Sequence, residues 1–383
     1  MKKINAVLVV IVISFLAGCI KSFTPKVNKY DNLLVVDGFV TDGPGPYTVK
    51  LSRSGTLKQF SVPAPYPNCM VSVKDDQGNA FAFQEKQPGI YQSDSLTFRA
   101  VPGRSYQVLI ATKEGEQIES SLDVLSTGVG IQSIDASLEH KDDPNLFYGR
   151  DGYQFYLNTA TFDASDNYLL WRLQTTYKFQ ADYGIFSYID KSGNYLPMIA
   201  GDTFRTCYRN VEVPQILLLN TANLNTTQII HYPLYYEDNY TKALTMRYSL
   251  NVQQYKINGA AFTYWSEIKK ITDSGGDLYS SQPYQVKNNL VNKSNPEIPV
   301  LGYFMVAGMT EKRIFKDKPP ITFLYDKCAP GEPQRYIVEL MLRKPNLWPI
   351  YFAETEKGMY LLDQECVNCL LTGTQTKPSF WVE

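Results

Sequence analysis

Histidine is nearly absent from this sequence. His140 and His231 are its only histidines among 383 residues, so a triad-type hydrolase or a mixed cysteine and histidine zinc site would have to use one of them. His140 precedes a polar loop and His231 follows an apolar run, and neither has the surroundings of a catalytic histidine. We therefore expect no metal site.

The sequence motifs of the common enzymes are also missing. The chain has no Gly-x-Ser-x-Gly, no His-Glu-x-x-His, no phosphate-binding glycine loop and no dinucleotide fingerprint. Glycosidases have no such motif, because their two carboxylates need no fixed local spacing. We interpret the protein as non-enzymatic, with no catalytic residue and no cofactor.

Neither sign of charge is in excess. The 37 Lys and Arg residues balance 38 Asp and Glu residues, which gives a formal net charge of −1. Nucleic acid is therefore not expected as a partner, since its recognition relies on a basic surface. Long apolar runs are missing after residue 16, so no later segment is expected to span a bilayer.

The one long apolar run lies at the N-terminus. Residues 6–16 carry no charge, are interrupted by one serine and follow Lys2 and Lys3. This run is too short to cross a hydrocarbon core of ~30 Å and is typical of a secretory signal peptide, here over residues 1–18. A Leu-Ala-Gly-Cys sequence ends it, which predicts cleavage before Cys19 and acylation of that residue as a membrane anchor. The alternative is an ordinary secretory peptide with Cys19 as a disulfide partner.

Five more cysteines follow, an odd number for an oxidising compartment, so one thiol is expected to stay free. Cys366 and Cys369 could form a short-loop disulfide, a redox pair or half of a zinc site. We favour the disulfide, because the chain has no second close cysteine pair and no thioredoxin-like context. Cys207 and Cys328 would then form the other bridge, leaving Cys69 as a small buried residue.

An aromatic-rich composition, with 28 Tyr and 19 Phe, favours strands and predicts a mostly β protein. After a tether at 19–30, the region 31–127 has short alternating segments with turns about every ten residues, which is typical of an immunoglobulin-like β-sandwich. The segment 75–79 resembles a calcium loop but lacks the later glutamate. We interpret it as a hairpin turn.

The region 128–383 is expected to form a larger β-rich domain with one or two helices. Its expected strands include 153–158, 168–175 and 335–342. Apolar side chains recur at helical spacing and predict a helix near 260–272. Within it, we interpret Tyr264 and Trp265 as core anchors for a sheet, with a ligand platform as the alternative.

The densest aromatic cluster contains Tyr232, Tyr235, Tyr236 and Tyr240. Tyrosine gives a large contact area at a small entropy loss and is enriched at interface hot spots, so this cluster could stack sugars or anchor a protein partner. Ordinary strand packing is the alternative.

Several segments occur in the order found in one bacterial family. They are 34–38, 41–49, 51–53, 264–270, 275–279, 282–283, 295–296, 300–304 and the tail from Cys366 to Trp381. In these segments the chain resembles a family of Bacteroidota outer-membrane lipoproteins catalogued as domain of unknown function 4249. The resemblance covers nearly the whole mature chain, and the family has no established catalytic residues to carry over.

The resemblance implies an outer-membrane lipoprotein encoded beside a TonB-dependent transporter. On that basis we expect an accessory subunit that captures a substrate or gates its entry, with the transporter barrel as partner and a glycan or peptide as cargo. The alternatives are a surface glycan-binding module and a structural or adhesive envelope lipoprotein. A transporter accessory should bury more than about 1,000 Å² against its partner, whereas a glycan module should have an aromatic-lined groove.

Overall fold

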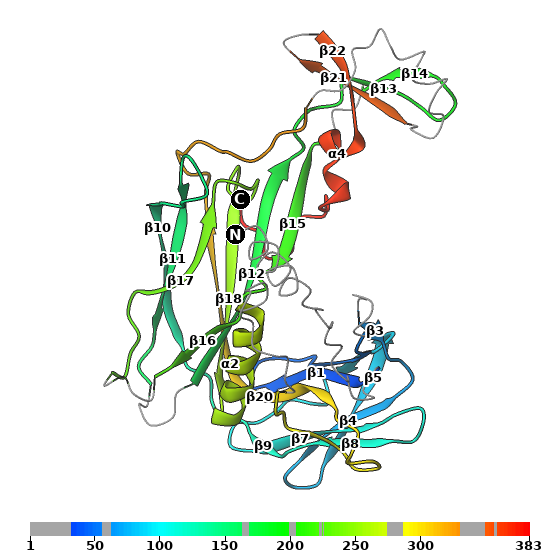
Figure 1. The fold of residues 1–383 in the computed structure, drawn as a ribbon, viewed down its shortest axis with the longest axis vertical. Coiled ribbons are helices and arrows are strands. Elements are labelled where there is room, and N and C mark those ends of the chain that lie inside the picture. The colour runs from blue at the N-terminus through cyan, green and yellow to red at the C-terminus, as the bar shows by residue number, and fades with distance from the viewer. Residues whose placement is uncertain are drawn as a thin grey trace, which may run out of the picture.

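The chain is described here by a computed structural model. It describes residues 32–55, 63–162, 168–198, 204–221, 224, 226–273, 286–329, 349–355 and 358–383. This part is mostly β, as predicted. An N-terminal lobe, a central β-sandwich and a small distal sheet follow one another along the long axis (Figure 1). The predicted signal peptide, Cys19, the tether and the expected strand at 335–342 lie outside the described residues.

The N-terminal lobe is a curved antiparallel sheet. Its strands are β1 (Leu34–Thr41), β2 (Thr48–Arg53), β3 (Ala64–Pro65), β4 (Met70–Asp75), β5 (Ala80–Gln87), β6 (Ile90–Ser93), β7 (Ser105–Ala111), β8 (Gln117–Ser120) and β9 (Asp123–Val124). Seven of them pair along one path, β1-β2-β6-β5-β4-β7-β8, while β3 pairs with β2 and β9 pairs with β7. Alternate side chains such as Val36, Val49 and Tyr91 are fully buried in one core. The specific immunoglobulin-like arrangement is not confirmed by this pairing.

The turn between β4 and β5 is the hairpin turn that the sequence predicts. Asp75 Oδ1 accepts hydrogen bonds from the backbone N–H groups of Gln77 and Asn79, both at 2.9 Å. The other carboxylate oxygen is paired with Arg104 at 2.7 Å. The aspartate is therefore used by the turn itself.

A distant segment of the chain returns to the N-terminal lobe. β19 (Leu290–Asn292) pairs with β8, and the first half of β20 (Leu301–Lys316) runs parallel to β1. The second half of β20 pairs antiparallel with β18 (Tyr248–Ile257). β20 therefore contributes to both lobes. The chain first passes from the N-terminal lobe to the sandwich near residue 127, but later segments of the chain also belong to the N-terminal lobe.

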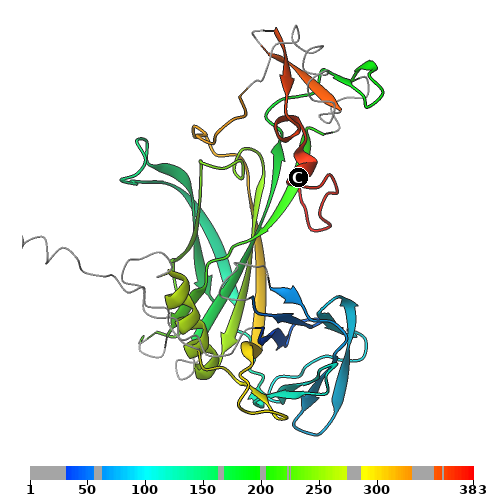
Figure 2. The same cartoon turned by 45° about the vertical axis from the view of Figure 1, so that its right-hand side comes forward.

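The central sandwich packs two sheets face to face. One contains β10 (Ile131–Lys141), β11 (Arg150–Thr159) and β17 (Tyr232–Asp238), and the other contains β12 (Tyr168–Gln180), β15 (Thr206–Glu212), β16 (Leu217–Asn220), β18 and the end of β20. Trp171 of β12 is fully buried between them and stacks on Tyr232 of β17, with ring centroids 5.1 Å apart. Phe155 stacks on Tyr248 in the same core, at 5.7 Å. The two sheets separate clearly in Figure 2.

Helix α2 (Gly259–Asp273) packs on the outer face of the larger sheet, near the N-terminal lobe (Figure 1). Its position confirms the helix predicted near 260–272. Tyr264 is buried beside Tyr303 of β20, and Trp265 packs edge-on against Tyr264 at 5.3 Å. Both side chains therefore anchor the helix to the sheet. No helix within the described ranges has the length and apolar character needed to cross a membrane.

The distal sheet has the order β14-β13-β21-β22. Its strands are β13 (Ser187–Ile189), β14 (Tyr195–Pro197), β21 (Ile350–Thr355) and β22 (Gly358–Leu362). After β22, the short helices α4 (Gln364–Val367) and η2 (Cys369–Leu371) lead the chain back to the central sandwich (Figure 1).

The disulfides differ from the predicted pairing. Cys207 is bonded to Cys369, and Cys328 to Cys366, so the predicted Cys366–Cys369 and Cys207–Cys328 bridges are wrong. The turn from α4 into η2 places Cys366 in the core of the distal region and Cys369 in the core of the sandwich. These two cysteines are close in sequence but therefore bond to different partners. Cys69 is free and half-buried.

Candidate functional site

A cavity of about 480 Å³ lies where the central sandwich meets the C-terminal segment. Its walls come from β12, β15 and β17, together with the loop that follows β17 and the α4–η2 segment. A volume of this size is typical of small-molecule sites, which measure about 300–1,000 Å³. This cavity is therefore the candidate binding site.

Strand alternation explains which side chains reach the cavity. Successive side chains on a strand point to opposite faces, so Thr175, Tyr177 and Phe179 of β12 line the cavity together. Arg209 and Val211 do the same from β15, which pairs antiparallel with β12. Much of the cavity wall is thus formed by neighbouring strands of the sandwich.

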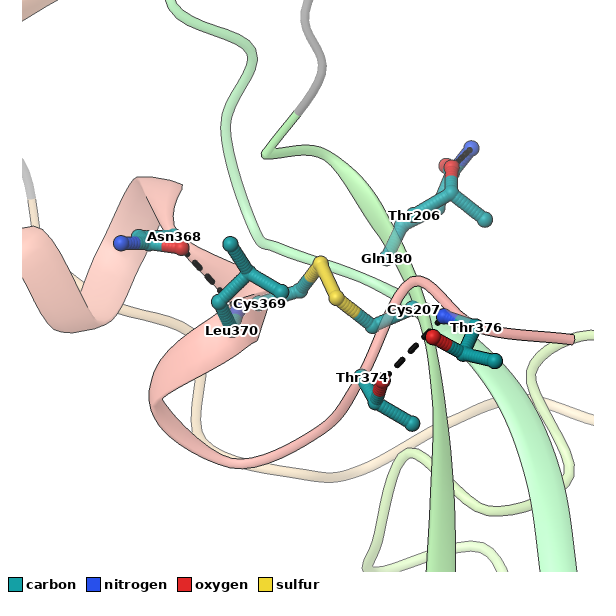
Figure 3. The surroundings of a disulfide bond; sticks show 8 residues. All are labelled: Gln180, Thr206, Cys207, Asn368, Cys369, Leu370, Thr374 and Thr376. Atoms are coloured by element: carbon teal, nitrogen blue, oxygen red, sulfur yellow. Dashed lines mark hydrogen bonds between the residues drawn. A yellow bond between two sulfur atoms is a disulfide. The ribbon is translucent and has the colours of Figure 1, made fainter.

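The C-terminal segment is fastened over the cavity. The Cys207–Cys369 disulfide joins β15 to η2, with a Cα–Cα distance of 5.7 Å (Figure 3). The backbone N–H of Cys369 also donates to the carbonyl of Phe204 at 2.9 Å. Just beyond, Tyr208 and Thr374 exchange two backbone hydrogen bonds of 2.8 Å. The segment 365–372, which contributes its lining residues to the cavity and is called the roof below, is therefore held in place.

Glu237 is the buried acid of the cavity. It is 9% exposed, and its Oε2 accepts hydrogen bonds from the hydroxyls of Tyr248 at 3.0 Å and Tyr235 at 3.1 Å. Oε1 accepts a longer bond from Thr241, at 3.4 Å. Burial is the largest cause that raises the pKa of this carboxyl, to about 7, while the three hydroxyls oppose the shift and Asp238 adds to it. Near neutral pH, Glu237 can therefore either accept or donate a hydrogen bond.

Two cationic side chains also line the cavity. Lys242 is neutralised by Asp182, whose carboxylate lies 2.7 Å from the ammonium group. Arg209 makes no ion pair within the part of the chain that the structure describes. Burial raises the pKa of the Tyr177 hydroxyl, and the nearby charge of Arg209 opposes that rise. The cavity thus holds a buried acid and an arginine without a carboxylate partner.

The four tyrosines predicted as a binding cluster do not share one surface. Tyr232 stacks on Trp171 inside the sandwich, and Tyr235 lines the cavity. The hydroxyl of Tyr236 lies within hydrogen-bond distance of two backbone carbonyls, at 2.8 and 2.9 Å. Tyr240 lies beside an arginine guanidinium, 5.7 Å from its ring centroid. Of the four, Tyr235 is the one placed at the candidate site.

Sequence reasoning missed Glu237, Arg209 and Tyr177 as a group. Glu237 had a readable signal, because it lies two residues after Tyr235 in an alternating strand and must share its inward face. Arg209 had no such signal, since its partner strand is set by the fold. Among the described residues, no group of three or more His, Cys, Asp or Glu side chains is arranged to hold a metal ion.

Comparison with known proteins places the chain in a family. No curated protein sequence matches it. A solved DUF4785 family protein from Legionella pneumophila is similar at 11% identity over 58% of this chain and 52% of its own, with a TM-score of 0.18, so this chain spans about half the length of that protein. The model of a family described as Domain of unknown function (DUF4249) matches residues 20–313. Because this match covers most of the sequence, the chain belongs to the DUF4249 family.

Proposed function

We propose that this protein is a lipid-anchored binding protein of the bacterial outer membrane that captures a small molecule for a TonB-dependent transporter. Acyl chains on Cys19 would hold it on the membrane, and the Glu237 cavity would hold the cargo. The transporter barrel would be the partner that takes the cargo onward. We propose a capture role without a chemical step.

The observation that carries this proposal is the roofed cavity with Glu237 at its buried end. A buried carboxyl without a charged partner is costly to fold, and a disulfide holds the roof above it. Such an arrangement is better explained by a ligand than by stability. The signal sequence and the lipidation sequence ending at Cys19 support the location, and the resemblance to transporter-linked lipoproteins supports the partner.

A second candidate function is glycan binding in the same cavity. The aromatic side chains of Tyr177, Phe179 and Tyr235 line it and could stack on sugar rings. This reading shares the capture role but does not require a transporter. The two functions therefore differ in the partner they predict.

The proposal is tested by recovering the tagged, lipidated protein from its native outer membrane in mild detergent and identifying its partners by mass spectrometry. We expect a transporter barrel in stoichiometric amount. The Cys19→Ser variant should leave the membrane fraction and lose the barrel, because it cannot be acylated. Recovery of the wild-type lipoprotein alone would contradict the accessory role and leave glycan binding as the candidate for array experiments.

A further inference from the structure

The Glu237 cavity holds one buried carboxyl and one guanidinium that make no ion pair within the described residues. Among the described residues, Glu237 accepts hydrogen bonds from hydroxyl groups only, and Arg209 makes no ion pair. Lys242 is already neutralised by Asp182 at 2.7 Å. Glu365, the other acid of the lining, is exposed at the roof. Arg209 is exposed as well, so a ligand that enters can find a buried carboxyl and, toward solvent, a guanidinium.

Tyr177 relates these two groups in space. Tyr177 lines the cavity together with both groups, and the charges of Arg209 and Glu237 act on the pKa of its hydroxyl in opposite directions. Both charged groups thus lie close to one phenol, although they come from different sheets of the sandwich. A small molecule could reach both at once.

The wall between the charged groups is largely apolar. Phe179, Val211 and Val213 line it from the larger sheet, and Tyr235 lines it from the smaller one. These apolar side chains can cover an apolar part of a ligand, while the polar groups of the lining lie elsewhere around the cavity. A carboxyl, a guanidinium and apolar side chains in one cavity fit a ligand that has one positive charge, one negative charge and an apolar part, which is a zwitterion.

We propose that the cavity binds a free amino acid or short peptide, with the ligand's ammonium group on Glu237 and its carboxylate on Arg209. This inference rests on the proposed capture function and names its class of cargo. An ammonium group would supply the charged partner that Glu237 lacks, and a guanidinium binds a carboxylate with two parallel hydrogen bonds. The aromatic rings of Tyr177 and Tyr235 would add favourable contact with the cation.

Glu237 also predicts that the protein loses a proton when the ligand binds. Because burial raises the pKa of Glu237 to about 7, part of the population carries a proton at neutral pH. An arriving ammonium group favours the ionised carboxylate, so binding should release a proton to the buffer. A sugar would bring no such charge and should release none.

The experiment begins with a library of free dipeptides and amino acids, screened against the purified chain by native mass spectrometry. The strongest binder is then measured by isothermal titration calorimetry beside its N-acetylated and C-amidated forms. We expect each cap to weaken binding at least about tenfold, as for a lost hydrogen bond to a charged group. Calorimetry in buffers of different ionisation enthalpy should detect the released proton.

Two variants test which residue binds each end of the ligand. Glu237→Gln keeps an oxygen that can accept from the tyrosine hydroxyls and should abolish both proton release and the penalty for N-acetylation. Arg209→Gln should abolish the penalty for C-amidation. Glu212→Gln, an exposed position on the opposite face of β15, should behave as wild type. The proposal would be overturned if N-acetylation and C-amidation left the affinity unchanged. It would also be overturned if both modifications still weakened binding to the two variants.

The outcomes separate this inference from the proposed function. Binding of maltotriose but of no library member, lost when Val213→Trp fills the cavity, would overturn the zwitterion and retain capture. The absence of any binding from the library would also overturn it. A protein that comes from its native membrane without a cavity-dependent cargo would contradict the capture function itself.

Discussion

Cys369 is bonded to Cys207 across 162 residues of sequence. The bond ties the C-terminal η2 turn to β15, the strand that contributes Arg209 to the cavity wall. Roof and wall therefore move as one unit. The C-terminal segment acts here as a structural part of the candidate site.

Removing this bond should destabilise the protein. We expect the double variant Cys207→Ala/Cys369→Ala to lower the free energy of unfolding by about 2–5 kcal/mol, because the closed loop is long and the unfolded chain gains freedom. Guanidinium denaturation under oxidising conditions measures the change. Cys69→Ala, at the free cysteine, is the control and should cost less than about 1 kcal/mol. Equal midpoints for both variants would contradict the role of the bridge.

Glu237 should make stability depend on pH. Its pKa is raised from 4.5 to about 7 in the folded protein, so the folded state binds more protons than the unfolded state between these values. The stability is fully present below about pH 4.5 and is lost as the pH rises to about 7, by roughly 3 kcal/mol at most. Urea unfolding of wild type and Glu237→Gln from pH 4 to pH 8 measures this. A difference between the two proteins that stays constant with pH would contradict the assignment.

Gly302 should tolerate no side chain. It has φ of +91°, and a Cβ atom there would lie 1.9 Å from the carbonyl oxygen of Val36 on the paired strand β1. Gly302→Ala should therefore lower the free energy of unfolding by about 3 kcal/mol or more, since strain in φ and a backbone clash combine. Gly78 has the same φ with nothing within 4 Å, so Gly78→Ala isolates the conformational cost of about 1–2 kcal/mol. Thermal unfolding that ranks the two variants equally would refute the close approach of β1 and β20.

Asp42 joins three segments between the N-terminal lobe and the sandwich. Its carboxylate accepts hydrogen bonds from the backbone N–H groups of Met309 at 2.6 Å and Gly128 at 3.1 Å. Asp42→Ala leaves both donors without this partner and should cost about 1–3 kcal/mol in unfolding free energy. Asp37 is exposed on β1, with its nearest ion pair at 4.0 Å, so Asp37→Ala should stay within about 0.5 kcal/mol of wild type. The reverse order in chemical denaturation would show that the junction does not depend on Asp42.

Local patterns predicted the parts of this fold that depend on neighbouring residues. The β content, the helix at α2 and the hairpin turn at Asp75 each follow from spacing within about 15 residues. The four bridging cysteines were predicted but their partners were not, because bonding follows position in space. Cys366 and Cys369 face different cores. Proximity in sequence was a poor guide there.

The site could not be predicted, because it is assembled from distant segments. Tyr177, Arg209, Glu237 and Cys369 come from β12, β15, β17 and η2, and their meeting depends on sheet order. Likewise, no local sequence pattern indicates that β20 pairs with β1 in one lobe and with β18 in the other. Alternation indicates which face a residue occupies but not which strand lies opposite it.

The most direct test of the central claim is native mass spectrometry of the protein purified from its native cells in mild detergent. We predict a discrete adduct of small-molecule mass on the wild-type chain. The Val213→Trp variant, whose indole would fill the cavity, should lack this adduct, and the exposed control Glu212→Trp on the opposite face should keep it. The same adduct on all three proteins, or on none of them, would contradict a capture site around Glu237.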